Sequence, residues 1–193
     1  MDNSSEISSL DTVKVIDNFL PRDTFLHIRE GILDTGFPWF FMDHTVDASD
    51  RERGGCKNYK YSHLIYDSML SSRKSYEWEF NTMVNEFLKP FYEQLNPWML
   101  MRVVAHSTTY TGDTSYVSDW HVDQHGPHTK TMRAAVFCFN TCNARTCFLD
   151  GSEIESVENR LMTFPMRLQH RVRTATNVKR RVIINVNYFP NDI

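Results

Sequence analysis

Asp119-Trp120-His121-Val122-Asp123 is the stretch around which this 193-residue sequence is best interpreted. Successive side chains of a β-strand point to opposite faces, so a strand here would place His121 and Asp123 on one face and Trp120 and Val122 on the other. An imidazole and a carboxylate on one face are two of the three ligands of a facial metal site. His-x-Asp alone has little weight, because a chain with eight histidines often contains such a pair by chance.

The composition is typical of a soluble globular protein of one domain. The sequence is 41% hydrophobic and 13% aromatic, and its net charge of -3 gives no general attraction to nucleic acid or to an anionic membrane. The first ten residues are polar and no apolar run is long enough for a membrane helix, so we expect a cytoplasmic protein without an export signal.

The four cysteines fit a reducing compartment. Cys56, Cys138, Cys142 and Cys147 lack paired C-x-x-C spacing and are expected to be buried free thiols. A metal site formed by the last three is a remote alternative, because their spacing is irregular.

Hydrophobic periodicity predicts helices first and strands afterwards. A helix is expected from Pro21 to about Leu33, and a second one carries an apolar stripe from Phe80 to Phe91 that Pro90 should kink or split. Besides Val13–Ile16, the expected strands are 99–105, 120–125, 134–139, 146–149, 160–164, 181–189 and one at His170. Many short strands without intervening helices predict a mainly β fold, a sandwich or barrel backed by N-terminal helices.

We expect residues 1–12 to be a flexible polar tail and residues 13–193 to be a single domain. Residues 13–97 would give helical support and residues 98–193 the barrel core. The charged residues 43–60, which include Gly54-Gly55, are either a solvated loop or a lid that closes on a substrate.

Three further residues give the His-x-Asp pair its context. His170 lies 49 residues after His121, and Arg181 opens the last apolar strand eleven residues later. Tyr110 precedes His121 by eleven residues across a turn that contains Gly112. His-x-Asp, a distal His and a following Arg form a pattern that resembles the Fe(II)/2-oxoglutarate-dependent dioxygenases.

The resemblance is greatest to the prolyl-hydroxylase branch. The last strand there similarly has Arg, six mostly apolar residues and Tyr-Phe, and the opening Ile16–Pro21 (IDNFLP) is also similar. The resemblance implies a double-stranded β-helix, a jelly-roll or cupin-like barrel. It also implies Fe(II), 2-oxoglutarate and O₂, with a substrate C–H bond hydroxylated while 2-oxoglutarate is decarboxylated to succinate.

Residue by residue, the resemblance implies that His121, Asp123 and His170 bind the metal. Arg181 would bind the distal carboxylate of 2-oxoglutarate through its guanidinium fork. Arg180 is the alternative, since only one of two neighbouring strand residues points inward. Tyr110 would donate a hydrogen bond near 2-oxoglutarate, or it is an ordinary tyrosine at a strand end.

The sequence departs from the family pattern at three places. Asn143–Thr146 keeps only the Thr of a Gly-Gly-x-Thr segment, Lys179 replaces a common Gly, and Cys138 stands where the branch has a tyrosine. These differences leave the metal ligands intact but weaken the case for a peptidyl-proline substrate.

Other interpretations stay open. A small-molecule or nucleotide-modifying oxygenase of the same fold is one, and a non-catalytic barrel that binds a metal or a ligand is another. A zinc hydrolase using the same three ligands is the third. His125 and His128 are expected mainly in loops, with His125 near the substrate as the alternative. The basic residues Arg167, Arg171, Arg173, Lys179 and Arg180 form either a solvated face or a site for an acidic substrate.

Overall fold

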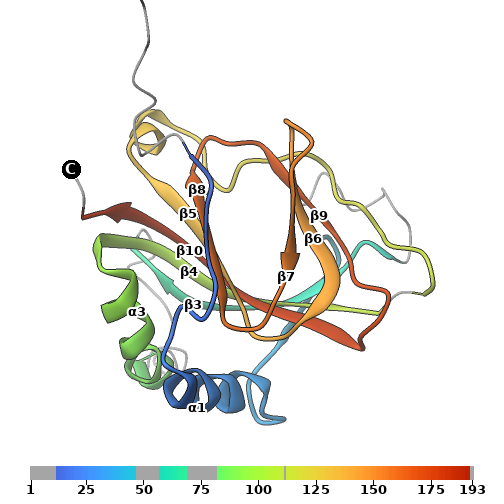
Figure 1. Ribbon diagram of the computed structural model, residues 1–193, viewed down its shortest axis with the longest axis horizontal. Coiled ribbons are helices and arrows are strands. Elements are labelled where there is room, and N and C mark those ends of the chain that lie inside the picture. Colours follow the sequence, from blue (N-terminus) through green and yellow to red (C-terminus); the bar gives the residue numbers. More distant parts are fainter. Residues whose placement is uncertain (1–11, 47–56, 69–81, 111, 192–193) are drawn as a thin grey trace, which may run out of the picture.

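The structure is a computed structural model that describes residues 12–46, 57–68, 82–110 and 112–191. Its strands form two antiparallel sheets that face each other (Figure 1). The larger sheet has the strand order β1-β8-β5-β10-β4-β3-β2, and the smaller sheet has the order β7-β6-β9. The strands are β1 (Lys14–Ile16), β2 (Phe40–Met42), β3 (Lys60–Asp67), β4 (Pro97–Thr109), β5 (Arg133–Cys138), β6 (Cys142–Phe148), β7 (Glu153–Ser156), β8 (Arg160–Pro165), β9 (His170–Arg173) and β10 (Arg180–Pro190).

Helices pack on the outer face of the larger sheet. Helix α1 (Arg22–Leu33) buries Phe25, Ile28 and Ile32, the apolar stripe expected from the sequence. Residues 82–87 are helical, and after a turn at Leu88 helix α3 (Lys89–Leu95) follows with Pro90 in its first turn. The chain thus breaks beside Pro90, because proline cannot donate an interior helical hydrogen bond.

One phenylalanine joins these helices to the sheet. Phe137 of β5 is fully buried, and its ring contacts those of Phe19, Phe25, Phe91 and Phe139 at centroid distances of 5.1–6.0 Å. Such offset and edge-to-face contacts add to the free energy gained by burying apolar area. The helices are therefore held to the sheet by a shared aromatic core.

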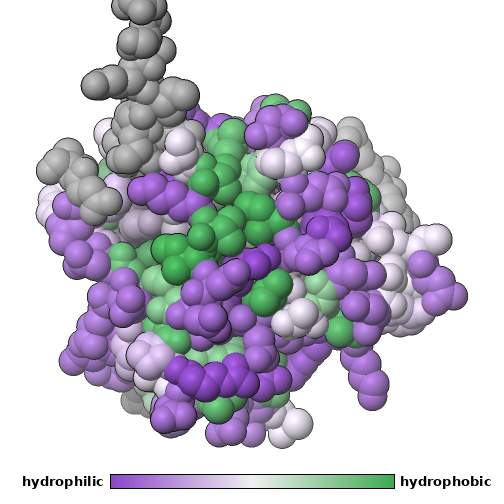
Figure 2. All heavy atoms as spheres, viewed as in Figure 1, coloured by the Kyte–Doolittle hydropathy of each residue, from purple (hydrophilic) through white to green (hydrophobic). Residues whose placement is uncertain are grey.

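A second core lies between the two sheets. Phe148 of the smaller sheet meets Phe164 of the larger one edge-to-face at 5.2 Å. On the face of the molecule shown in Figure 2, apolar side chains gather in the middle and hydrophilic side chains surround them. This layer supports the inner faces of both sheets, from which the site described below is built.

Three expectations about elements need correction. The predicted strand Trp120–His125 is wrong, since His121 makes only an isolated bridge and the chain bends at Asp123. Strand β3 begins at Lys60, the last residue of the stretch 43–60 that is expected to be a loop or a lid, and strand β7 is not predicted because Glu153–Ser156 carries little apolar signal. No helix of the described residues has the length and hydropathy needed to span a membrane.

Candidate metal centre

His121, Asp123 and His170 meet at one end of the inner face, although 47 residues separate Asp123 from His170. His121 and His170 exchange two backbone hydrogen bonds of 3.0 Å, which holds the 119–123 segment against the start of β9. One ligand atom from each of the three side chains lies within 4.8 Å of the others. Among the described residues, this is the only group of three or more His, Cys, Asp or Glu side chains with such a geometry.

Each imidazole is oriented by a carbonyl two residues earlier in the chain. The Nδ1–H of His121 donates to the carbonyl of Asp119 at 3.2 Å, and that of His170 donates to Leu168 at 3.1 Å. These bonds fix the tautomer in which Nε2 has a free lone pair. Both Nε2 atoms face the same carboxylate oxygen, Asp123 Oδ1, at 4.0 Å and 3.5 Å. This is the arrangement in which neutral imidazoles bind a metal.

Two asparagines of β10 fix the carboxylate. Asn185 and Asn187 donate side-chain amide hydrogens to Asp123 Oδ2 at 3.0 Å and 2.9 Å. Asn187 also donates to Asn185 Oδ1, so the two amides orient each other. With Oδ2 engaged, Oδ1 is left to face the imidazoles, as a monodentate ligand would.

The charges of the group are coupled. Burial opposes ionisation of Asp123, but the hydrogen bond and charge of His170, with Asn185 and His121, hold the pKa of Asp123 well below its usual value. Burial likewise opposes protonation of His170, yet Asp123 outweighs it and raises the pKa of His170. Burial and His170 together lower the pKa of His121. Of the three side chains, His170 beside Asp123 is therefore the one that binds a proton most readily when no metal is bound.

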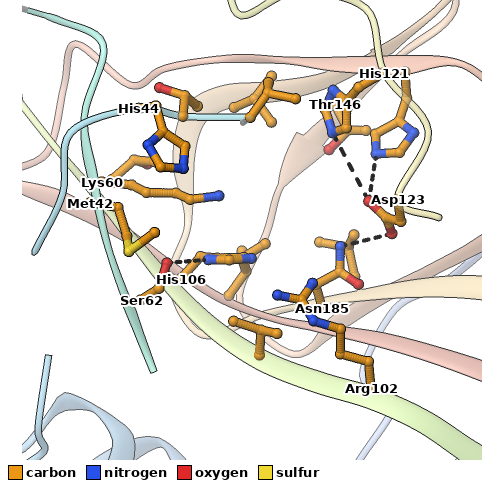
Figure 3. Close-up of a pocket in the computed structure, with 18 of the residues that line it drawn as sticks. Met42, His44, Lys60, Ser62, Arg102, His106, His121, Asp123, Thr146 and Asn185 are labelled. Atoms are coloured by element: carbon orange, nitrogen blue, oxygen red, sulfur yellow. Dashed lines mark hydrogen bonds and ion pairs between the residues drawn. The ribbon is translucent and has the colours of Figure 1, made fainter. Parts of the chain in front are cut away.

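The group opens onto a cavity of about 990 Å³ (Figure 3). Its floor is the inner face of three neighbouring strands of the larger sheet, where alternate residues point inward. Strand β10 contributes Arg181, Ile183 and Asn185; β4 contributes Arg102, Val104, His106 and Thr108; and β3 contributes Lys60, Ser62 and Leu64. The cavity is large enough for two small molecules beside an ion.

The two candidate arginines lie on opposite faces of β10. Arg181 lines the cavity with 3% of its surface exposed, and its Nε and Nη2 find no hydrogen-bond partner among the described residues. Arg180 points away and donates to the carbonyl of Leu33, the last residue of helix α1. A buried guanidinium without a partner is costly unless an anion binds it, so the cavity is suited to an anionic ligand at this end.

Known structures of similar shape are numerous, although no family model and no curated protein sequence matches the chain. A prolyl hydroxylase from Trichoplax adhaerens, solved with a fragment of hypoxia-inducible factor, is 16% identical with a TM-score of 0.55, over 92% of this chain and 83% of that one. A Pseudomonas putida prolyl-4-hydroxylase is 14% identical with a TM-score of 0.51, over 92% and 91%. A 2OG-Fe(II) oxygenase family protein from Burkholderia pseudomallei is 12% identical with a TM-score of 0.55, over 93% and 87%.

This is the fold of the 2-oxoglutarate–Fe(II) oxygenases. The prolyl hydroxylases are among its representatives, which agrees with the resemblance seen in the sequence. For a 2-oxoglutarate oxygenase fold, the donor set is suitable: two neutral imidazoles and one carboxylate can occupy one face of an iron ion and leave three positions open.

Tyr110 lies outside the set of residues that line the cavity. Its side chain is 44% exposed, it does not line the cavity, and its hydroxyl donates to Asp113 at 2.5 Å. Strand β4 ends at Thr109, so Tyr110 is the first residue after it. The hydroxyl of Tyr110 is thus engaged by Asp113 outside the cavity lining, and its role toward 2-oxoglutarate stays a prediction.

The remaining histidines divide as follows. His125 is exposed but lines the cavity, whereas His128 is exposed in the short helix Pro127–Lys130 and does not. His106 was not singled out from the sequence, yet it lies on the cavity floor. Its Nδ1 is 2.9 Å from Ser62 Oγ, and burial with the nearby Lys60 holds the pKa of His106 well below its usual value.

Polar residues at alternate positions of apolar strands were the signal that could have revealed this floor. Asn185 and Asn187 follow Arg181 at even spacing in β10, and Arg102 and His106 do so in β4. Lys60 carried no such signal, because its strand follows a charged stretch.

Residues 43–60, the possible lid, are described only in part. Within them His44 and Thr45 line the cavity, and the backbone N–H of Thr45 donates to Asn58 Oδ1. Residues 47–56 lie outside the described residues.

Proposed function

We propose that this protein is an Fe(II)- and 2-oxoglutarate-dependent oxygenase that hydroxylates a C–H bond of its substrate. The observation that carries the proposal is the pairing, in one cavity, of the His121–Asp123–His170 group with the buried, unpartnered guanidinium of Arg181. The two sheets would form the double-stranded β-helix of the prolyl-hydroxylase branch, with the helices supporting its larger sheet.

The metal would be held by Nε2 of His121, Nε2 of His170 and Oδ1 of Asp123. When bound, Fe(II) with 2-oxoglutarate supplies oxidative decarboxylation coupled to transfer of an oxygen atom from O₂. The chain's own contribution is to orient both imidazoles, because the carbonyls of Asp119 and Leu168 accept from Nδ1–H and leave Nε2 toward the metal. Asn185 and Asn187 hold the carboxylate in its ligand orientation.

Arg181 would bind the distal carboxylate of 2-oxoglutarate. The residue shares a face of β10 with Asn185, four residues away, so the two Cα atoms are separated by about 13 Å along the strand. Asn185 marks the metal end of this row through its bond to Asp123. An extended dicarboxylate reaching from the metal toward a long arginine side chain fits that separation. Ile183 between them would contact its methylene carbons.

The direct test is succinate formation by the purified full chain. We expect slow, Fe(II)-dependent conversion of 2-oxoglutarate to succinate even without a substrate, and loss of it in His170→Ala. His128→Ala is the matched control, because His128 is an exposed histidine outside the cavity. Metal-dependent activity that does not need O₂ would point instead to the zinc-hydrolase alternative. No 2-oxoglutarate turnover, with intact metal binding, would point to a non-catalytic barrel.

The neighbouring arginines provide a second matched pair. Arg181→Ala should weaken 2-oxoglutarate binding by at least about 100-fold, since it removes one partner of a buried charge pair. Arg180→Ala should leave that affinity within a few-fold, because its guanidinium lies near Leu33. The reverse result would place the co-substrate on the other face of β10 and contradict the proposed site.

We also propose that the protein works in a reducing compartment such as the cytoplasm. Cys138, Cys142 and Cys147 are buried free thiols in the described part of the chain. Buried thiols of this kind need no oxidising environment to be maintained.

A further inference from the structure

The cavity carries more positive charge than the proposed cofactors require. Among the described residues that line it are two arginines and a lysine, but only one carboxylate, Asp123. The basic residues are Lys60, Arg102 and Arg181. They come from β3, β4 and β10, three strands that are neighbours in the larger sheet. The cations are therefore brought together by the fold on one floor, with His106 between them.

This inference rests on the proposed function, because the cofactors decide which charges are already balanced. Fe(II) and Arg181 would bring three positive charges, and Asp123 and the 2-oxoglutarate dianion would bring three negative ones. Arg102 lies 3.8 Å from the carboxylate of Asp67 and is 40% exposed, so it is partly compensated by the chain and by water. One cation then stays without a counterion, and that cation is Lys60.

Lys60 is unpartnered in the described part of the chain. No hydrogen bond or ion pair involves its ammonium there, whereas Lys57, three residues earlier, donates to Thr114 Oγ1 at 2.6 Å. Burial, helped by the charge of Arg102 and opposed by that of Asp123, lowers the pKa of Lys60 to about 8. A half-buried ammonium in this state is stabilised by any anion that reaches it.

The side chain points toward the open side of the metal centre. In Figure 3 the ammonium of Lys60 extends into the cavity between His44 and the His121–Asp123 group. The charge of Arg102 lowers the pKa of Lys60 and the charge of Asp123 raises it, and the charge of Lys60 in turn lowers the pKa of His121. The ammonium therefore faces the space in front of the metal, beside His44 and Met42, which line the same part of the cavity.

We propose that the substrate is a small molecule with an anionic group, a carboxylate or a phosphate, which binds to the ammonium of Lys60 in front of the metal. Ser62 and neutral His106 line the cavity beside this lysine and offer further hydrogen bonds. A cavity of about 990 Å³ accommodates 2-oxoglutarate together with one such molecule. Lys60 is then a substrate-binding residue, and a neutral peptidyl proline is not the substrate class that the cavity fits.

The test follows Lys60 itself by NMR in the full chain carrying ¹³C at the lysine ε-carbons. The Lys60 signal is assigned by its absence from Lys60→Arg, and the Lys57 signal serves as control in the same spectrum. The probes are inorganic phosphate, acetate and the neutral acetamide. We expect phosphate or acetate to shift the Lys60 signal saturably and at least fivefold more than the Lys57 signal, with no shift from acetamide. The stronger of the two anions identifies the group.

The titration is repeated with Zn(II) and 2-oxoglutarate present. We expect the anion response of Lys60 to persist, because the co-substrate would bind Arg181. Loss of the response on adding 2-oxoglutarate would assign Lys60 to the co-substrate and overturn the proposal. An equal shift of the Lys57 signal, an equal shift with acetamide, or no shift with either anion would also overturn it. If Zn(II) and 2-oxoglutarate do not bind, the proposed function fails, while the metal-free titration still decides whether Lys60 is an anion site.

Discussion

At the scale of single residues, the metal centre depends on side chains that are not ligands. Asp123 has two oxygens, and the amides of Asn185 and Asn187 engage one of them. Without these donors the carboxylate is free to rotate or to chelate through both oxygens. The asparagines therefore decide which oxygen faces the imidazoles.

Asn187→Ala tests this dependence. Removing a group that orients a metal ligand typically weakens metal binding by about 10-fold or more, and we expect that loss for Mn(II) measured by calorimetry. Asn191→Ala, which changes an exposed asparagine near the end of the chain, should leave the affinity unchanged. Equal affinities for the two variants would show that the orientation of Asp123 does not depend on β10.

The protonation of the group predicts how metal binding responds to pH. The pKa of His121 and that of Asp123 are lowered, whereas that of His170 is raised, so His170 is the last of the three to lose its proton as the pH rises. Metal binding must therefore displace the proton of His170, and affinity should fall as the pH falls through the pKa of this residue.

Calorimetry in two buffers of different ionisation enthalpy measures this proton. We expect release of about one proton per Zn(II) at a pH between the pKa of His121 and that of His170, decreasing toward zero as the pH rises above the latter. Release of two protons would mean that His121 is also charged in the free protein. That result would contradict the charge distribution described for the group.

At the scale of elements, β5 connects the site to the helices. Its inward Val136 lines the cavity, and its outward Phe137 is the centre of the aromatic core below α1 and α3. Phe137→Ala should lower the free energy of unfolding by about 3–5 kcal/mol in urea titrations, because a large buried ring is replaced by a void. Phe41→Ala in strand β2, where 60% of the side chain is exposed, should cost less than about 1 kcal/mol. Similar costs for both would mean that the helices do not depend on this contact.

The sequence predicted elements well where the hydrophobic period was clear. The apolar stripe of α1 and the runs that became β5, β8 and β10 are long and consistent. The sequence did not predict strands β3 and β7, because about half of their residues are polar and pairing with neighbouring strands, not the side-chain pattern, defines them. The 119–123 segment shows the opposite failure, since an alternating pattern there gives only a single bridge to β9.

For the site, the spacing of His121, Asp123, His170 and Arg181 selected residues that the structure brings to one cavity. The spacing worked only through resemblance to a family, because nothing in a sequence alone says which distant segments will be neighbours. Tyr110, which the same pattern selected, lies beyond the end of β4 and outside the cavity lining. The pattern omitted Lys60 and His106, whose positions depend on the pairing of β3 with β4.

At the scale of the whole molecule, a bound ion would tie two distant parts of the chain together. His121 and Asp123 precede β5, and His170 begins β9 in the smaller sheet, so the ion adds a cross-link that the unfolded chain lacks. At an ion concentration of 100 times the dissociation constant, the folded state gains about 2.7 kcal/mol. For a chain of this size each kcal/mol corresponds to about 2–4 °C.

We therefore expect Mn(II) to raise the melting temperature by about 5–10 °C and EDTA to reverse the increase. His121→Ala should melt at the same temperature with and without Mn(II). A variant that keeps the full increase would show that the ion binds somewhere other than at the His121–Asp123–His170 group.

The most direct test of the central claim is the visible charge-transfer absorption that Fe(II) gives when a 2-oxo acid chelates it, measured without oxygen. We expect one such chromophore per chain on adding Fe(II) and 2-oxoglutarate. His170→Ala should abolish it, and Arg181→Ala should require much higher 2-oxoglutarate concentrations to form it. If the chromophore does not form, or forms equally well in His170→Ala, the group does not hold the iron and the account is contradicted.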